Sequence, residues 1–123
     1  MNKPAPPATR PWEKLYQISN TTVLAENATL RVLDMTLLPG ESVPWHLHPD
    51  TDDLFVGLAG TFEVFHGPQA ARTTVQAPGR HLVPKGETHS VHNRSDAPCQ
   101  FLLIQDGGPY QFIATHGAAV PAE

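Results

Sequence analysis

The chain has 123 residues, enough for one modest hydrophobic core but too few for two independent ones. Twelve acidic side chains against eight basic ones give a net charge of −4, and no basic cluster is present that could follow a phosphate backbone. No stretch approaches the roughly 18 consecutive apolar residues of a membrane span, and the N-terminus lacks an apolar signal segment. We therefore expect a soluble, cytoplasmic protein that binds neither nucleic acid nor membrane.

The predicted elements lie between two extended ends. Residues 1–20 carry four prolines in the first eleven positions and predict an extended arm. No segment of the chain sustains helical apolar spacing for three turns, and the best candidate is the short RPWEKLYQI in this arm. From there Gly, Pro, Asn and Asp interrupt the chain about every ten residues, and the short apolar runs between them predict strands. The expected strands are near residues 21–26, 29–38, 43–48, 53–58, 61–66, 72–76, 81–84, 89–93, 99–106 and 110–115. Residues 116–123 predict a flexible tail.

Many short strands without a helical partner predict an all-β fold over residues 21–115. Each strand has one apolar face to bury, and two packed sheets or a closed barrel are the stable ways to do so. The single cysteine, Cys99, begins the apolar run CQFLLI, which indicates a buried strand rather than a reactive thiol.

The segment WHLHPDTDDLFVGLAG contains the first candidate site residues. Alternation along a strand places His46 and His48 on one face. After the turn at PDT, the same alternation groups Asp53 with Phe55 and turns Asp52 to the opposite face. Only one of the two aspartates can therefore join the two imidazoles.

A third imidazole is expected from the segment PKGETHSVHN, in which His89 opens a strand and His92 faces the other way. Three neutral imidazoles and one carboxylate form a mixed nitrogen and oxygen site for a divalent transition metal, with about two positions left open on an octahedral ion. The alternative is a metal-free barrel in which these histidines line a polar pocket.

The segment around the first two histidines resembles the first sequence motif of the cupins. That motif, a glycine, an HxH pair, a glutamate and a second glycine, is matched at every spacing by Gly40, His46, His48, Asp53 and Gly60.

The second cupin motif is also matched. Its positions are occupied by Gly79, Pro84, Gly86, His89 and Asn93, with the first gap one residue short. The resemblance covers residues 20–115 and implies a single-domain double-stranded β-helix, the cupin jelly-roll barrel, which often forms homodimers. It also implies metal ligation by the three histidines and the acidic residue of the two motifs: His46, His48, Asp53 and His89.

The main departure from the cupin pattern is Asp53, because the family usually has glutamate there. One methylene less shortens the reach by about 1.5 Å, whereas a metal needs its oxygen ligand at about 2.0–2.2 Å. Asp53 either coordinates after a small adjustment or leaves a more open three-histidine site.

The resemblance does not fix the reaction, since cupins include many enzymes and also binding proteins. One hypothesis is a metal-dependent enzyme, an oxygenase (for example a dioxygenase), isomerase or lyase, that acts on a small organic acid or sugar-like molecule in the barrel. It would hold one divalent ion per chain: Fe, Mn, Ni or Zn. The other hypothesis is a non-catalytic module that binds or senses a small molecule or the metal. The sequence leaves turnover open.

Catalysis would need a proton-transfer group near the metal, and the candidates are His66, His81 and Tyr110. An apolar pocket is expected from the large side chains available on the strands: Met35, Phe55, Phe62, Val64, Phe101 and Phe112. Arg31 and Arg72 lie mid-strand and have no assigned role. Outward apolar residues such as Leu54, Val56 and Leu58 predict a homodimer.

Overall fold

The computed structural model describes residues 20–117. The predicted N-terminal arm up to Ser19, with its short helical segment, and residues 118–123 of the predicted tail lie outside the described residues.

Ten strands form, one for each strand predicted from the sequence. Their bounds are β1 (Asn20–Glu26), β2 (Leu30–Leu37), β3 (Ser42–Leu47), β4 (Thr51–Ala59), β5 (Thr61–His66), β6 (Ala71–Gln76), β7 (Arg80–Val83), β8 (His89–His92), β9 (Cys99–Gly107) and β10 (Ile113–Ala114). Residues 20–117 contain no helix, and therefore no helix in this range could cross a membrane.

The last strand is much shorter than the predicted range of 110–115. Gly107, with φ of +125°, adopts a backbone conformation that other residues resist, and Pro109 cannot donate a ladder hydrogen bond. The chain therefore crosses from β9 to β10 through an irregular loop at 108–112, and only Ile113 and Ala114 pair with β3.

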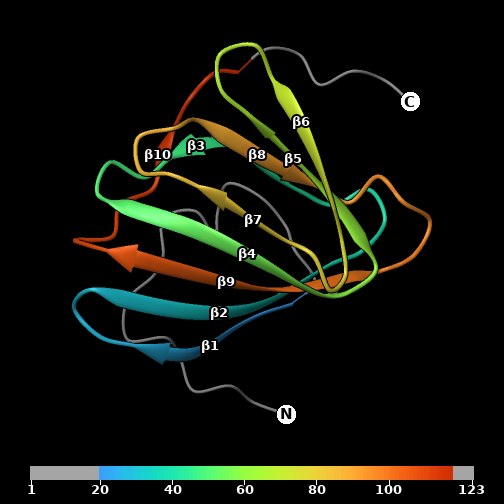
Figure 1. Cartoon of the computed structure of the whole chain (residues 1–123), viewed down its shortest axis with the longest axis horizontal. Coiled ribbons are helices and arrows are strands. Elements are labelled where there is room, and N and C mark those ends of the chain that lie inside the picture. Colours follow the sequence, from blue (N-terminus) through green and yellow to red (C-terminus); the bar gives the residue numbers. More distant parts are fainter. Residues whose placement is uncertain (1–19, 118–123) are drawn as a thin grey trace.

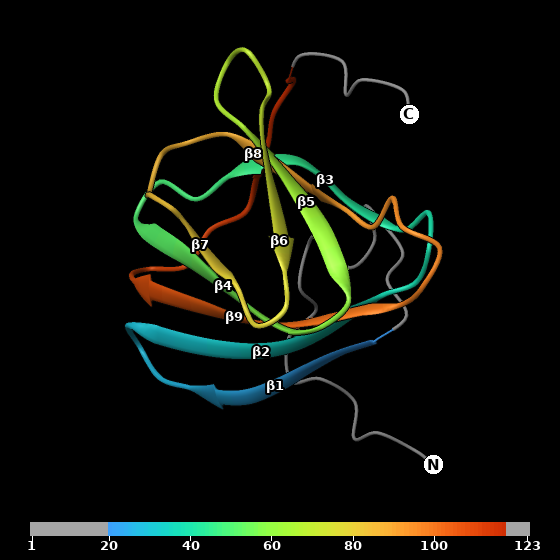
Figure 2. The same cartoon turned by 45° about the vertical axis from the view of Figure 1, so that its right-hand side comes forward.

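The strands form two antiparallel five-stranded sheets that face each other (Figure 1; Figure 2). One sheet has the order β1-β2-β9-β4-β7 and the other has the order β10-β3-β8-β5-β6. The predicted all-β fold, a double-stranded β-helix, is confirmed.

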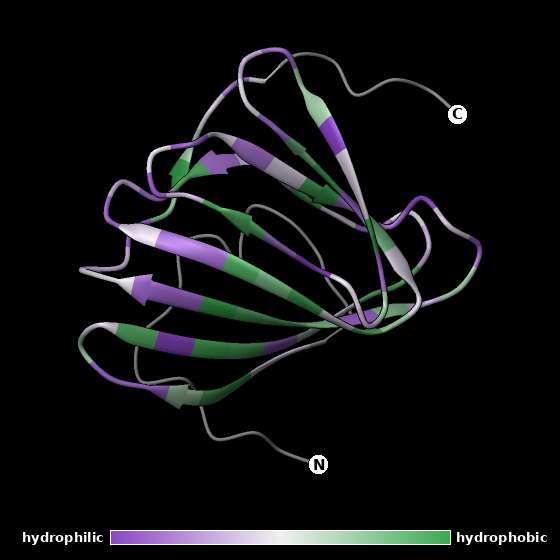
Figure 3. Ribbon diagram, in the orientation of Figure 1, coloured by the Kyte–Doolittle hydropathy of each residue, from purple (hydrophilic) through white to green (hydrophobic). Residues whose placement is uncertain are grey.

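The core lies between the two sheets and is centred on three phenylalanines. Phe62 packs against Phe101 with ring centroids 4.5 Å apart, and Phe55 lies 5.6 Å from Phe101. All three are at most 1% exposed. The beginning of β4 and the end of β9 are hydrophilic, whereas their middle parts are hydrophobic (Figure 3). Polar residues therefore gather at one end of an apolar barrel.

Asn93, the last residue of the second motif, forms side-chain hydrogen bonds to neighbouring strand and loop residues. Its side chain is buried, and Nδ2 donates to the carbonyl oxygens of Leu37 and Ala97, each at 2.8 Å. Its Oδ1 accepts hydrogen bonds from the backbone N–H and the hydroxyl of Ser95. Asn93 therefore stabilises the fold and makes none of these contacts with the metal-ligand candidates.

We expect Asn93→Ala to lower the free energy of unfolding by about 2–4 kcal/mol, because four hydrogen bonds of a buried side chain are lost together. Denaturant unfolding would measure the change. Asn27→Ala is the matched control, since Asn27 caps an exposed turn at Thr29, and it should cost about 1 kcal/mol or less. Equal losses in the two variants would contradict the role given to Asn93.

The outer face of the first sheet carries a row of aliphatic side chains. Cross-strand pairing aligns Val32, Ile104, Leu54 and Leu82 on neighbouring strands, and Leu82 is 50% exposed. Exposed apolar rows of this kind are typical of association surfaces. The homodimer expected from the sequence stays a prediction, for which this row is a candidate contact surface.

We therefore expect sedimentation at micromolar concentration to give a homodimer, and Leu82→Asp to shift it to monomer because a charge would be buried in the contact. Leu38→Asp is the control, since Leu38 is similarly exposed but lies beyond the end of β2. A monomeric wild type, or equal dissociation in both variants, would contradict dimerisation through this row.

Candidate metal centre

The three histidines are brought together by the pairing of β3 with β8. His46 on β3 lies opposite His89 on β8, with ring centroids 4.2 Å apart. His48 follows two residues later, where the N–H of Gly86 donates to its carbonyl oxygen at 2.8 Å. Gly86 has φ of +81°, and through this hydrogen bond the turn of the second motif is joined to the histidine pair of the first.

Each imidazole is oriented by a hydrogen bond from Nδ1 to a backbone carbonyl. The acceptors are Pro44 for His46 (2.6 Å), Gln111 for His48 (2.6 Å) and Glu87 for His89 (3.0 Å). With Nδ1 carrying the donated proton, Nε2 is left with the lone pair that a metal requires. The tautomer of all three rings is therefore the one suited to ligation through Nε2.

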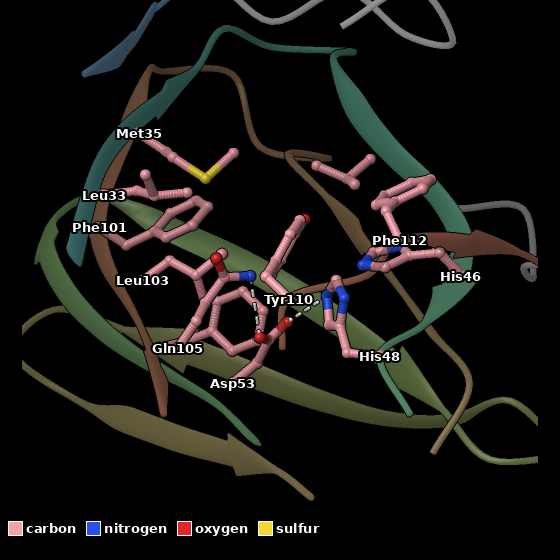
Figure 4. A pocket seen from close by; sticks show the side chains of 12 residues that line it. Leu33, Met35, His46, His48, Asp53, Phe101, Leu103, Gln105, Tyr110 and Phe112 are labelled. Atoms are coloured by element: carbon pink, nitrogen blue, oxygen red, sulfur yellow. Dashed lines mark hydrogen bonds and ion pairs between the residues drawn. The ribbon is translucent and has the colours of Figure 1, made fainter. Parts of the chain in front are cut away.

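Asp53 points into this group of imidazoles from the opposite sheet (Figure 4). Its Oδ2 lies 3.1 Å from Nε2 of His48 and 3.1 Å from Nε2 of His89. Its Oδ1 accepts a hydrogen bond of 3.1 Å from Nε2 of Gln105. Adjacent ligands of an octahedral metal with bonds of about 2.1 Å are separated by about 3.0 Å, so these distances match a metal-ligand shell.

The ligand atoms of all four candidates, His46, His48, Asp53 and His89, lie within 4.8 Å of one another, and all four residues are buried. Nε2 of His48 makes no well-directed hydrogen bond within residues 20–117, despite its short distance to Asp53. A buried lone pair without a donor costs free energy unless a ligand uses it. The donor set therefore fits a divalent metal.

The electrostatics favour an ionised carboxylate at Asp53 and a neutral imidazole at His46. Burial alone would raise the pKa of Asp53, but the imidazoles of His48 and His89, each 3.1 Å from its Oδ2, outweigh burial, so this pKa lies well below its ordinary value. Burial, followed by the neighbouring imidazoles, lowers the pKa of His46 well below its ordinary value. For His48, burial lowers the pKa, but the Asp53 carboxylate outweighs burial and the pKa is raised.

The short side chain of Asp53 does not hold it back from the cluster. Asp53 pairs in register with Gln105 on β9 and with Val83 on β7, and this places its carboxylate at the imidazoles. Asp52 faces outward as predicted, and its Oδ1 accepts a hydrogen bond of 2.8 Å from the backbone N–H of Lys85.

The pocket at the cluster is small. The space open to the centre of a water molecule is about 20 Å³, enough for about one water. Its lining residues are Leu33, Met35, Val43, His46, His48, Asp53, Phe55, Phe101, Leu103, Gln105, Tyr110 and Phe112. Phe62 and Val64, which the sequence offered as lining residues, belong instead to the core. The rings of Phe55 and Phe101 pack against Phe62 and separate it from the pocket.

The sequence analysis missed Gln105, although it holds Asp53 in place. A signal was present, because alternation in the segment FLLIQ puts Gln105 on the same face as Phe101 and Leu103. A polar residue that ends an inward apolar row is a candidate partner for a buried carboxylate.

Only one of the three proton-transfer candidates lines the pocket. The ring of Tyr110 lies 5.1 Å from that of His48. His66 and His81 instead face each other at 5.0 Å, and Nε2 of His66 lies 3.0 Å from the Thr73 hydroxyl. Cys99 is 1% exposed and burial raises the pKa of its thiol, as suits a structural residue.

Comparison with known families agrees with this geometry. The family model described as "Cupin domain" matches residues 33–105, more than half of the chain, and the chain belongs to this family. No curated protein sequence matches the chain.

Solved structures share the fold. A double-stranded β-helix protein from Klebsiella pneumoniae is 21% identical with a TM-score of 0.71, covering 88% of this chain and 97% of its own. A cupin-2 domain protein from Shewanella frigidimarina is 24% identical with a TM-score of 0.60, covering 76% of this chain and 86% of its own. Oxalate decarboxylase from Bacillus subtilis is 26% identical with a TM-score of 0.63, but the match covers 71% of this chain and only 24% of that enzyme.

If Asp53 is a ligand, Asp53→Ala should weaken metal affinity by about tenfold or more, because an anionic oxygen is lost. Asp53→Glu should retain binding, since the family usually has glutamate at this position. Asp52→Ala is the control and should leave affinity unchanged, because its carboxylate bonds to Lys85 on the other face. Metal titrations would compare the three variants, and a larger loss from Asp52→Ala would contradict the assignment.

Proposed function

We propose that the protein binds one divalent transition metal per chain through His46, His48, Asp53 and His89. The observation that carries this proposal is the set of three Nδ1–H bonds to backbone carbonyls, which leave three Nε2 lone pairs in one buried cluster with the Asp53 carboxylate. A hydrogen-bonded histidine with its second nitrogen aimed into a pocket is typical of a metal ligand.

We further propose that the site acts on a small organic acid, as an oxygenase, isomerase or lyase. When bound, the metal would act as a Lewis acid toward the oxygen atoms of the acid and, if it is iron, could activate dioxygen. The similarity to an oxalate decarboxylase supports an organic acid over a sugar-like molecule, because oxalate is itself a small organic acid.

The residues around the cluster orient the metal-ligand candidates and contact the bound acid in this proposal. Gln105 holds Asp53 through its amide N–H, and Phe112 stacks on His46 with ring centroids 4.3 Å apart and planes 13° from parallel. These contacts fix the orientation of two ligands and exclude water from the imidazole face. Burial raises the pKa of Tyr110, so its hydroxyl stays protonated and can donate a hydrogen bond to an anion.

A non-catalytic binding module is the second candidate. One observation favours it: within residues 20–117, Tyr110 is the only one of the three proton-transfer candidates that lines the pocket, and it holds its proton tightly. A site without a group that exchanges protons near neutral pH can bind a ligand without turning it over.

Elemental analysis of protein purified without added metal tests the proposal. We expect about one divalent ion per chain in the wild type and almost none in His48→Ala, because one of four ligands is removed. The matched control is His92→Ala, since His92 lies on the outer face of β8 and packs against Phe65. Equal metal content in wild type and His48→Ala would remove the basis for the site.

A further inference from the structure

A second and larger cavity adjoins the metal centre. Its volume is about 210 Å³, enough for a small organic molecule, and it opens near the beginning of β4 and the end of β9. The lining residues are Glu26, Asn27, Ala28, Thr29, Leu30, Arg31, Thr51, Gln105, Gly107, Pro109 and Tyr110. Gln105 and Tyr110 line both cavities, so the two spaces share a wall.

Arg31 places a buried positive charge at this cavity. Its side chain is 6% exposed, continuing the inward row of β2. The guanidinium lies 3.9 Å from the ring centroid of Tyr110, and its Nε is 3.2 Å from Oε2 of Glu26. Cross-strand pairing aligns Arg31 with Gln105 and Gln105 with Asp53, so the cation and the metal-ligand candidate lie in one row of the sheet.

Two further polar atoms at the cavity lack partners. Thr51 is 3% exposed and Gln105 is 2% exposed. Within the described range 20–117, neither Oγ1 of Thr51 nor Oε1 of Gln105 has a hydrogen-bond partner. The amide of Gln105 cannot be reversed without cost, because Nε2 must donate to the Asp53 carboxylate. Buried polar atoms of this kind require a ligand or an ordered water.

We infer that this cavity binds a small hydroxy acid. Arg31 and the Thr51 hydroxyl donate to the carboxylate of the acid, and Oε1 of Gln105 accepts a hydrogen bond from the hydroxyl group of the acid. The inference deepens the proposed function. It rests on that function only for the orientation of the bound acid, in which the end away from the carboxylate faces the metal centre across Tyr110.

The charges around Arg31 favour a carboxylate over a phosphate. Glu26 lies at the same guanidinium, so the cavity offers one cation already shared with one carboxylate. A singly charged anion can be accommodated there, whereas a doubly charged phosphate meets greater repulsion from Glu26. A neutral diol carries no charge and therefore gains no charge-assisted hydrogen bond from Arg31.

The test is calorimetric titration of the full chain with glycolate, acetate, inorganic phosphate and ethylene glycol, before and after removal of metal by a chelator. We expect glycolate to bind in both states and more tightly than the other three probes. Tighter binding of phosphate, or equal binding of acetate and glycolate, would overturn the hydroxy-acid assignment.

Four variants locate the binding. Arg31→Met should weaken glycolate binding at least about tenfold, since a charge-assisted bond is lost. The control Arg72→Met also removes an arginine paired with a glutamate, since Arg72 lies 3.5 Å from Glu63, but Arg72 is on an edge strand of the other sheet and glycolate binding should stay within about twofold. Glu26→Gln should strengthen binding because a competing carboxylate is removed.

Thr51→Val covers the case in which Arg31→Met fails to fold. It should weaken glycolate binding while leaving the unfolding temperature at or above that of the wild type, because an unpartnered buried hydroxyl is replaced by a methyl group. Unchanged glycolate affinity in Thr51→Val, or in a folded Arg31→Met, would overturn the inference. If glycolate binds only when metal is present, the inference fails and the metal proposal stands. If glycolate binds and the protein never holds metal, the metal proposal fails and the inference stands.

Discussion

The hydrogen bonds from three imidazole Nδ1 atoms to backbone carbonyls are the constraint on which the site depends. Each bond fixes both the plane of a ring and the nitrogen that keeps its lone pair. The carbonyls belong to Pro44, Gln111 and Glu87, which come from β3, the β9–β10 loop and the β7–β8 loop. The barrel therefore orients the three imidazole rings through its main chain, and the surrounding side chains supply packing and charge.

The polar cluster is tolerated in an apolar barrel because it is concentrated at one end. Burying a carboxylate without partners would cost several kcal/mol, but Asp53 has three nitrogen neighbours at 3.1 Å. The phenylalanine cluster fills the neighbouring interior of the barrel with apolar side chains. Asn93 belongs to a motif shared with the family but lies outside this polar cluster, and it therefore contributes hydrogen bonds to loops rather than to the metal centre.

Most of the fold could be predicted from the sequence because it depends on local rules. Alternation placed Asp53 inward and Asp52 outward, and turn residues marked all ten strands. The length of the final strand was predicted wrongly because its beginning depends on the conformation of the 107–109 backbone. The reach of Asp53 depends on the distance between strands of the two sheets, on which a periodic pattern has no bearing.

The contact between His48 and the carbonyl of Gln111 joins residues 63 positions apart in the chain. During synthesis, strands β3, β4 and β8, with both motifs, emerge from the ribosome well before residue 111. The ring of His48 acquires its acceptor only after the 108–112 loop has been made and has folded back. The metal centre is therefore among the last parts of the barrel to be completed, although its ligands are encoded in the middle of the chain.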